Sequence, residues 1–329
     1  MKRRVILRAD AGSSIGFGHF IRTSALASYL RHDFECVIAS HNPDGPLTPY
    51  QLEVIEQCGA SAQHLRAASI DTANEVFLQN IDKNDIVVLD NYYYATSYQQ
   101  NIKEKARALV CIDDVHDRHF VADVVMTFCP LERNDFSLEP YTRFFGGIEW
   151  AFLREPFFQK SAGSTRKFPG RKMVIAMGGA DPFRLTDKMV GVVRNVFPDV
   201  EICVIAGQTV EVSRIDDDKI SIYRKLSAGQ IVELFDSADW GLFPASTICV
   251  EAFARNLPVV AGHYVDNQHE FYEHGVANGW FAPLGNLTAD ENSLRKQLES
   301  FNPGMIAAAR PDFDFRARRE EIVDIFKSL

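Results

Sequence analysis

Short apolar runs alternate with amphipathic stretches along the first half of this chain. The apolar runs predict strands, and the stretches with apolar residues at helical spacing predict helices. The expected strands are residues 5–8, 36–39, 86–89, 108–112 and 124–126, and the expected helices are residues 20–31, 51–58 and 72–80. Each run is apolar on both faces, as in a parallel sheet that helices cover. The alternating order predicts a doubly wound α/β fold.

The same alternation starts again in the second half. The expected strands there are residues 172–177, 202–205, 240–243 and 259–262, and the expected helices are residues 184–197, 227–237, 247–255 and 269–274. Between the two series lies a small, polar tract with glycine and proline, residues 161–170, which is typical of an interdomain linker. We therefore expect two similar Rossmann-like domains, residues 1–160 and 171–329, that face each other across a cleft. The last expected helix, residues 315–328, could pack on either domain.

Composition narrows the class of protein. The length of 329 residues fits two domains, and a hydrophobic content of 46% supplies their cores. The net charge of −9 argues against a nucleic-acid partner, because non-specific binding to a polyanion needs a basic surface. We expect no membrane span and no secretory leader, because no apolar run is long enough for either. The six dispersed cysteines lack a C-x-x-C pair, which predicts reduced core thiols in a cytoplasmic protein.

The most informative polar segment follows the first expected strand. Gly16-Phe17-Gly18 forms a turn, and His19 stands where the next helix should begin. In open α/β sheets, ligands collect at the carboxyl ends of strands, and helix N-terminal amides favour anionic groups there. The segment lacks the third glycine of the dinucleotide fingerprint and the lysine of a P-loop. Turn chemistry alone favours a simple tight turn, so His19 is at this point only a candidate base.

Other polar groups of the first half follow strands of the same expected sheet. They are Arg8 and Asp10 at the end of strand 5–8, Asp90, Asn91 and Tyr92 after strand 86–89, and Asp113 and Asp114 after strand 108–112. Arg22 lies three residues after His19 and shares its helix face. Carboxylate, amide, phenol and imidazole groups are therefore expected at one edge of the sheet.

Three loops of the second half also follow strands and precede helices. They hold Gly178, Gly179, Asp181 and Pro182 after strand 172–177, Ser246, Thr247 and Glu251 after strand 240–243, and Asn267 and Gln268 after strand 259–262. Paired glycines let a ligand approach the backbone, and hydroxyls at a helix N-terminus suit a phosphate. Amides suit sugar hydroxyls and acetamido groups. Each loop by itself is equally a capped turn, with Asp181 as N-cap and Pro182 as the first helical residue. Three such loops at one edge indicate a ligand site.

A metal site is the weaker interpretation of the histidines and acidic runs. His116 and His119 have helical spacing beside Asp113 and Asp114, which is half of a metal signature, and no third ligand is evident. The acidic runs at residues 216–218 and 312–314 lie in polar, turn-like sequence and are typical of solvated loops. We therefore expect neither a metal nor another cofactor.

The motifs, taken in order, resemble a known enzyme family. Arg8-Ala9-Asp10, Ile15-Gly16-Phe17-Gly18-His19 and Arg22 look like the opening signature of the hydrolases that cleave UDP-2,4-diacetamido-2,4,6-trideoxy-β-L-altropyranose in pseudaminic acid biosynthesis. The similarity continues through Asp90-Asn91-Tyr92, Asp113-Asp114, the segment Ala151-Phe152-Leu153-Arg154, Met177-Gly178-Gly179-Ala180-Asp181, Ala245-Ser246-Thr247 with Glu251, and Asn267-Gln268. That family has the two-domain glycosyltransferase-B fold.

The resemblance implies a role for each matched residue. The catalytic residues would be His19, Asp10 and Tyr92. The residues that bind the sugar would be Gly16, Gly18, Arg22, Asn91, Arg154, Asn267 and Gln268. The residues that bind UDP would be Gly178, Gly179, Ser246, Thr247 and Glu251. His19 would act as general base on a water that attacks the anomeric carbon with inversion, because imidazoles ordinarily titrate near neutral pH. Backbone amides and helix dipoles would stabilise the departing diphosphate.

One position departs from the family pattern. The family's Asp-His-Tyr motif is Asp90-Asn91-Tyr92 here, and asparagine cannot exchange a proton. The departure puts the identity of the sugar in doubt more than it does the class of reaction. Two alternatives to a hydrolase follow from the resemblance: a glycosyltransferase that uses a UDP-activated amino sugar, and an inactive nucleotide-sugar binding protein. We expect a UDP-activated diacetamido sugar as the partner, and a monomer or weak oligomer.

Overall fold

A computed structural model describes residues 2–12, 16–159, 166–179, 181–207, 210–213, 217–308, 311 and 313–329. The chain forms two compact units, each described here by itself. The first comprises Met1–Arg154 and Asp314–Leu329, and the second comprises Glu155–Phe313. The last helix is thus part of the first unit. Most of the expected linker, residues 160–165, lies outside the described residues.

The first unit is built on a seven-stranded parallel sheet with the order β3-β2-β1-β4-β5-β7-β9. Its strands are β1 (Arg4–Arg8), β2 (Glu35–Ser40), β3 (Ser61–His64), β4 (Ile86–Leu89), β5 (Ala108–Ile112), β7 (Val124–Thr127) and β9 (Arg143–Gly146), with the short pair β6 (His119–Phe120) and β8 (Ser137–Leu138) outside it. The helices are α1 (Gly18–Leu30), α2 (Pro49–Cys58), α3 (Ile70–Leu78), α4 (Thr96–Lys105) and α11 (Phe315–Lys327).

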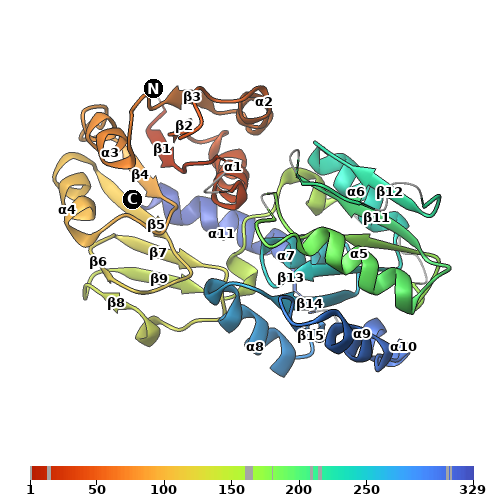
Figure 1. Cartoon of the computed structure of the whole chain (residues 1–329). Helices are drawn as coiled ribbons and strands as arrows, with labels where there is room; N and C mark the ends of the chain where they lie inside the picture. Colours follow the sequence, from red (N-terminus) through yellow and green to blue (C-terminus); the bar gives the residue numbers. More distant parts are fainter. Residues whose placement is uncertain are drawn as a thin grey trace. The chain divides into compact units, whose positions relative to one another are not determined.

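Apolar side chains cover both faces of this sheet. On one face, Phe77 of α3 and Ile102 of α4 pack with Val87 and Leu109 of the central strands. On the other face, α1 packs against β1, and α11 lies next to α1 (Figure 1). Every residue of β4 and β5 is buried, because these strands lie inside the sheet between two helical layers.

The second unit repeats the design with a six-stranded parallel sheet of order β12-β11-β10-β13-β14-β15. Its strands are β10 (Lys172–Ile175), β11 (Glu201–Ile205), β12 (Ile220–Tyr223), β13 (Trp240–Pro244), β14 (Val259–His263) and β15 (Ala282–Asn286). Its helices are α5 (Leu185–Val196), α6 (Ala228–Ser237), α7 (Thr247–Ala254), α8 (His269–Ala277), α9 (Glu291–Glu299) and α10 (Pro303–Ala308).

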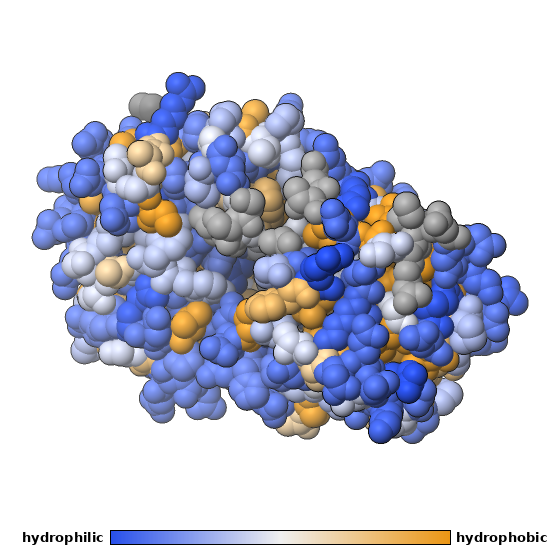
Figure 2. Space-filling view, in the orientation of Figure 1, coloured by the Kyte–Doolittle hydropathy of each residue, from blue (hydrophilic) through white to orange (hydrophobic). Residues whose placement is uncertain are grey.

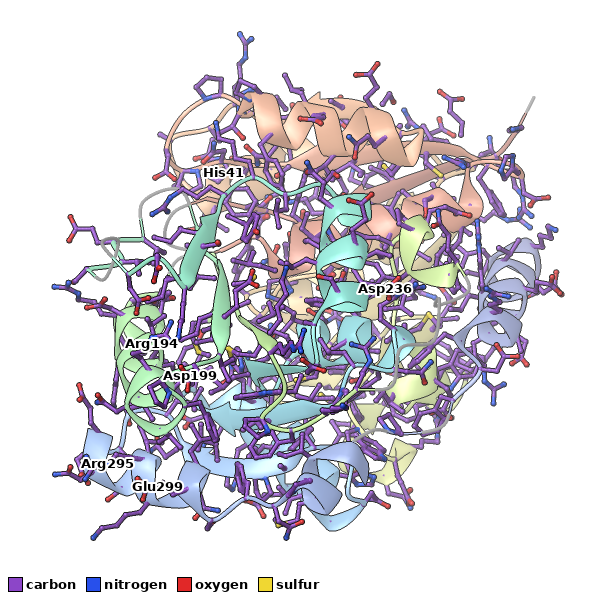
Figure 3. The ribbon with its side chains drawn as sticks, turned by 90° about the vertical axis from the view of Figure 1, so that its right-hand side faces the viewer. His41, Arg194, Asp199, Asp236, Arg295 and Glu299 are labelled. Atoms are coloured by element: carbon purple, nitrogen blue, oxygen red, sulfur yellow. The ribbon has the colours of Figure 1, made fainter. Side chains whose placement is uncertain are left out.

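The core of the second unit is centred on Trp240, which is fully buried. Its indole N–H donates to the carbonyl of Pro169 at 2.9 Å, and the ring packs edge-on against Phe168 and Phe197. On another part of this unit, Arg255 at the end of α7 forms a salt bridge with Asp236 of α6, labelled in Figure 3. These contacts fix the helices against the strands whose carboxyl ends bear the polar loops.

The expected doubly wound α/β class is confirmed for both units. Every expected strand and helix is present, with ends that differ by a few residues. The sequence pattern missed β3 and β15, whose sequences Ser-Ala-Gln-His and Ala-Pro-Leu-Gly-Asn lack a continuous apolar run, because both lie at sheet edges. It also missed the polar helices α4 and α9, and the edge strands β9 and β12.

The start of α5 differs from the expectation for an N-cap at Asp181 with Pro182 as the first helical residue. The helix begins at Leu185, after Arg184, which has a left-handed backbone (φ 53°). The Asp181 carboxylate nevertheless caps the helix from a distance, because it accepts the amides of Leu185 at 2.7 Å and Thr186 at 2.8 Å. The extra residues before the helix therefore form a tight turn that the carboxylate closes.

The remaining expectations concern thiols and surface. All six cysteines are buried, and none of them is in a disulfide bond. No helix within the described part of the chain is long and apolar enough to span a membrane. On the face shown in Figure 2, hydrophilic residues predominate and hydrophobic ones form scattered groups.

Candidate active site

The polar loops of the first unit meet where its sheet changes winding direction. The loops after β1 and β4 leave adjacent strands, and the chain connections on the two sides run in opposite directions across the sheet. This is the position at which doubly wound sheets bind ligands. Asp10, His19 and Asp90 all lie on these two loops or at the start of the helix that follows β1.

His19 is paired with a buried carboxylate. It is the second residue of α1, its side chain is 12% exposed, and its Nδ1 lies 2.7 Å from Oδ1 of Asp90. A carboxylate can only accept a hydrogen bond, so Nδ1–H donates a hydrogen bond to Asp90. Nε2 is then the acceptor nitrogen of the ring, and no described residue bonds to it. A histidine oriented in this way by a carboxylate is the usual arrangement of a general base.

Arg22 holds the other side of the same carboxylate. Its Nε lies 2.8 Å from Oδ2 of Asp90 and its Nη2 lies 2.6 Å from Oδ1, while the Thr23 hydroxyl donates to Oδ2 at 2.7 Å. The third guanidinium nitrogen, Nη1, donates to Oδ2 of Asp114 at 3.0 Å. Four side chains, His19, Asp90, Arg22 and Asp114, therefore form one continuous buried chain of charged and polar groups.

The charge of Asp90 is fixed by these partners. Burial by itself would raise the pKa of this carboxyl, but the guanidinium of Arg22 and the imidazole of His19 outweigh burial and hold the pKa well below its ordinary value. Burial would lower the pKa of Arg22, and the carboxylates of Asp114 and Asp90 outweigh it, so that this pKa is raised. Asp90 is thus a permanent acceptor that orients His19 and does not exchange protons near neutral pH.

The ring of Tyr92 packs against the imidazole of His19. The two rings are perpendicular, with an interplanar angle of 80° and centroids 4.5 Å apart. Arg118 donates through Nη2 to the backbone carbonyl of Tyr92 and so fixes the loop that holds the phenol. The turn that places Arg118 is itself closed by Asp113, whose Oδ1 accepts the amides of Val115 at 2.9 Å and His116 at 2.8 Å.

Asp10 is fully buried, and its carboxylate is already occupied by protein donors. Oδ1 accepts the amide of His41, labelled in Figure 3, at 2.7 Å. Oδ2 accepts Nη2 of Arg8 at 2.9 Å and the Tyr93 hydroxyl. Burial, with the nearby Tyr94 and Asp10, raises the pKa of Tyr93 far above its ordinary value, so its hydroxyl stays protonated. The carboxylate joins the carboxyl ends of β1 and β2 to the loop after β4.

Asn91 faces inward as well. It is 6% exposed, and its side-chain carbonyl accepts the backbone amide of Asp10 at 2.9 Å. The side chain therefore ties the loop after β4 to the loop after β1. The residue therefore acts as an acceptor for the backbone of the first loop.

The glycines of the first loop lie on the open side of the turn. Gly16 has a left-handed backbone (φ 80°), and its amide donates to the carbonyl of Gly12 at 2.9 Å. A Cβ at Gly16 or Gly18 would meet no atom of the described residues within 4 Å. Residues 13–15, which complete the loop, lie outside the described residues. Arg154, the last residue of the first unit's main segment, follows Leu153, whose amide and carbonyl both bond to the hydroxyl of Tyr29.

The second unit has an open glycine turn at its own switch point, between β10 and β13. Gly178 and Gly179 are exposed, and Gly178 has a left-handed backbone (φ 97°). A Cβ at Gly178 would lie 3.7 Å from the hydroxyl of Tyr264. Gly207 lies so close to the carbonyl of Gly179 that position 207 has no room for a side chain. The amides of Leu185 and Thr186 are already capped by Asp181, so the glycine turn is the part of this loop still open to a ligand.

The start of α7 is uncapped by side chains. Ser246 is its N-cap residue, yet its hydroxyl donates to the carbonyl of Pro244 at 3.3 Å and caps no amide. Thr247 begins the helix, and Glu251 lies one turn later on a partly exposed position. An uncapped helix start with partly exposed hydroxyls is suited to an anionic group.

The two amides of the third loop are placed differently. Asn267 is exposed, whereas Gln268 is buried and its Oε1 accepts the backbone amide of Tyr264 at 3.0 Å. Gln268 therefore shapes the loop after β14, and Asn267 projects from the short helix Asp266–Gln268.

Histidines and acidic runs considered for a metal have other partners. His119 lies within bonding distance of Ser137 and Glu139, and His116 packs on Phe136. Asp217 pairs with Arg194, labelled in Figure 3, while residues 216 and 312 lie outside the described residues. Within the described ranges, no three histidine, cysteine or acidic side chains come together as a metal-binding group.

The sequence indicated Asp90 and Asp114 by their place after buried strands and by the motifs, but it did not show which side chains they bind. Arg118 gave no signal, because its partner is a backbone carbonyl distant in sequence. Their roles depend on which loops the sheet order brings together.

Comparison with known proteins supports the resemblance found in the motifs. No protein-family model matches the chain. The chain is 23% identical over 277 residues to the UDP-2,4-diacetamido-2,4,6-trideoxy-β-L-altropyranose hydrolase of Campylobacter jejuni, which covers 80% of this chain and 93% of the relative. It is 24% identical over 290 residues to an uncharacterised protein of Methanocaldococcus jannaschii, covering 82% of this chain. The chain spans only 57% of that second relative's length.

Solved structures identify the fold. MnaA of S. aureus, determined with UDP, has a TM-score of 0.68 at 11% identity, with 99% of this chain and 96% of that chain covered. The calicheamicin glycosyltransferase CalG4 has a TM-score of 0.56 at 13% identity, with 100% and 95% covered. The fold is therefore of the glycosyltransferase-B type, with two Rossmann-like units, as the sequence predicted.

Proposed function

We propose that this protein is a nucleotide-sugar hydrolase that releases UDP and a free 2,4-diacetamido-2,4,6-trideoxy hexose by attack of water at the anomeric carbon. The single observation that carries the proposal is the pair formed by His19 and Asp90 at the switch point of the first sheet. The motif similarity to the Campylobacter jejuni hydrolase, spread over most of both chains, supplies the substrate class.

In the proposed reaction, Nε2 of His19 removes a proton from the attacking water. Asp90 accepts the hydrogen bond from Nδ1–H throughout, so the ring presents Nε2 in the basic form. The same carboxylate stabilises the imidazolium after the proton transfer. As the water oxygen bonds to the anomeric carbon, the bond from that carbon to the diphosphate oxygen breaks, and the electron pair leaves with UDP. Attack from the side opposite UDP inverts the configuration.

No separate acid is required for departure of UDP, because a diphosphate is a good leaving group. We propose that the Gly178 and Gly179 turn and the start of α7 at Ser246 and Thr247 hold the diphosphate, whose negative charge increases as the bond breaks. Backbone amides and the helix dipole act on this developing charge without reorganisation. Glu251, one turn into α7, is proposed to accept from the ribose hydroxyls.

The remaining residues either contact the sugar or hold the loops that do so. Tyr92, which packs on the His19 ring, Arg154 and Asn267 are proposed to contact the sugar. Gly16 and Gly18 are proposed to leave room for the sugar ring, because no atom of the described residues lies within 4 Å of a Cβ at either position. Asp10 and Asn91, both occupied by buried bonds, act by holding the loops in register. Arg22 acts through Asp90 in the same way.

The test is UDP release from a panel of UDP-activated sugars without any acceptor. The proposal predicts release from UDP-diacetamido-trideoxy hexoses, little release from UDP-glucose, and a free sugar of inverted anomeric configuration in the first product spectrum. No release from any sugar, with UDP still bound, would identify an inactive binding protein.

A glycosyltransferase is the second candidate, favoured by the structural likeness to CalG4. In that case His19 would activate an acceptor hydroxyl in place of water. Release of UDP that begins only when an alcohol or sugar acceptor is added would establish transfer and exclude hydrolysis as the main activity.

A further inference from the structure

We propose that Asp114 is a positioning residue for the reaction: through Arg22, it supplies the net negative charge that makes His19 an effective base. The inference rests on the proposed role of His19 as a base. Asp114 belongs to the loop after β5, one strand further from β1 than the loop that holds Asp90. It touches neither the imidazole nor, on the proposal, the substrate.

The contacts form an unbroken chain. His19 Nδ1 lies 2.7 Å from Asp90 Oδ1, Asp90 takes two nitrogens of Arg22, and Arg22 Nη1 lies 3.0 Å from Asp114 Oδ2. All of the linking side chains are enclosed: Asp90 is 0% exposed, Asp114 is 6% exposed and Arg22 is 7% exposed. Solvent therefore screens the charges of this chain poorly.

Charge counting shows what Asp114 adds. Arg22 alone neutralises Asp90, so a site with only these two groups would present no net charge to the imidazole. Arg22 Nη2 also comes within 3.1 Å of His19 Nδ1, close enough for its positive charge to oppose an imidazolium. The second carboxylate makes the group net negative when His19 is neutral and net zero when it has accepted a proton. Proton transfer to His19 thus removes a charge imbalance instead of creating one.

Within the described residues, the second oxygen of Asp114 bonds to no part of its loop. Oδ1 is buried, and no described donor lies within hydrogen-bonding distance of it. The neighbouring Asp113, by contrast, braces the loop through its Oδ1, which accepts two loop amides. Among the described residues, the bonding partner of the Asp114 carboxylate is Arg22, so the carboxylate acts on the guanidinium and, beyond it, on Asp90.

Among the described residues, charged or titratable groups reach His19 from three elements of the first unit. Asp90 and Tyr92 come from the loop after β4, Arg22 comes from α1, and Asp114 acts from the loop after β5. Asp114 is therefore the one described carboxylate besides Asp90 that is joined to His19 through ion-paired side chains.

The experiment compares Asp114→Asn with wild type by two measurements. The first is the pH profile of kcat/KM for UDP release, and the second is an NMR titration of the His19 imidazole, assigned with His19→Ala. Removing one negative charge makes the imidazolium less favourable, so the midpoint of the acidic limb should fall by roughly one pH unit. Turnover on the high-pH plateau should fall about three-fold, because only part of the loss in basicity is felt in the transition state of proton transfer.

Two controls separate charge from structure. Asp114→Glu keeps the charge and should restore the wild-type midpoint. Asp85→Asn makes the same change in another carboxylate that an arginine holds, but at the amino end of β4, and should leave the pH profile unchanged. If Asp114→Asn fails to fold, Asp114→Ser removes the charge with more room for relaxation and predicts the same fall in the midpoint.

A uniform loss of turnover at every pH with an unmoved midpoint would overturn the proposal and leave Asp114 a structural residue. A rise of the midpoint would also overturn it. The NMR titration needs no turnover: if the midpoint of His19 falls while no UDP-sugar is hydrolysed, Asp114 is confirmed and the proposed function is the part that fails.

Discussion

Oδ1 of Asp90 lies 2.7 Å from Nδ1 of His19, and the two residues are 71 positions apart in the sequence. The pair exists because β1 and β4 are neighbours in a parallel sheet, which brings the loops at their carboxyl ends together. Asp90 is wholly buried while the imidazole retains some exposure, so one end of the pair is held rigidly and the other is open to a reactant. This asymmetry is what a general base requires.

Replacement of His19 by alanine tests its role as the base. Because unit 2 is proposed to hold UDP by its own loops, His19→Ala should bind UDP with unchanged affinity and lose two to four decades of kcat, roughly the contribution of a positioned acid–base group. Calorimetry with UDP and a UDP-release assay measure the two quantities. Nearly full activity in this variant would remove His19 from the mechanism.

The sequence predicts a residue of this site only where its signal is local, and it does not predict contacts between residues far apart in the sequence. His19 and Asp90 were recognisable as polar residues next to buried strands, because strand ends are local features. The Arg22 contact with Asp114, 92 positions apart, depends on the sheet order and was not predictable from local pattern. Arg118 binds a backbone carbonyl, and because every residue has one, the residue types in the sequence do not indicate this contact.

The fold shows the same limit. Central strands such as β4, Ile-Val-Val-Leu, are apolar throughout because helices cover both faces, so they were found at once. The edge strand β3, Ser-Ala-Gln-His, needs no apolar run and is visible only through its pairing with β2. The inward orientation of Asn91 likewise follows from its bond to the Asp10 amide and not from its residue type.

Stability should depend on the charge of Asp90. Asp90→Asn leaves Arg22 without its main counterion and should lower the free energy of unfolding by about 3 kcal/mol near pH 7. The folded-state pKa of Asp90 is lowered, so its stabilisation is complete above the ordinary carboxyl pKa of about 4 and is lost as the pH falls toward the folded value. Denaturant unfolding should therefore show a difference between variant and wild type that shrinks between roughly pH 5 and pH 3. A difference that does not change with pH would contradict the charged state of Asp90.

The glycine turn after β10 offers a matched pair of variants. Gly178 and Gly279 both have left-handed backbones, at φ 97° and φ 65°, so alanine at either position should cost about 1 kcal/mol of stability. Gly178→Ala should also weaken UDP binding several-fold, because a methyl group and a strained turn disturb the diphosphate amides. Gly279→Ala should leave UDP affinity unchanged. Equal UDP affinities for the two variants would place the diphosphate elsewhere.

The proposed ribose contact predicts a specific loss of affinity. Glu251→Ala should raise the Kd for UDP about ten-fold, the effect of losing hydrogen bonds to a charged acceptor, with little change for inorganic diphosphate. Glu299, labelled in Figure 3, is an exposed residue of α9, and Glu299→Ala is the control with no expected effect. If Glu251→Ala weakens UDP and diphosphate alike, the residue acts on the helix start and not on the ribose.

The central claim, that His19 directs water to the anomeric carbon, is tested most directly by single-turnover hydrolysis of a UDP-diacetamido-trideoxy hexose in ¹⁸O-labelled water. Mass spectrometry of the quenched products locates the label. The account predicts one ¹⁸O in the free sugar, none in UDP, and loss of this labelled product in His19→Ala. Label in the nucleotide, which would require attack at phosphorus, or no product without an added acceptor would contradict it.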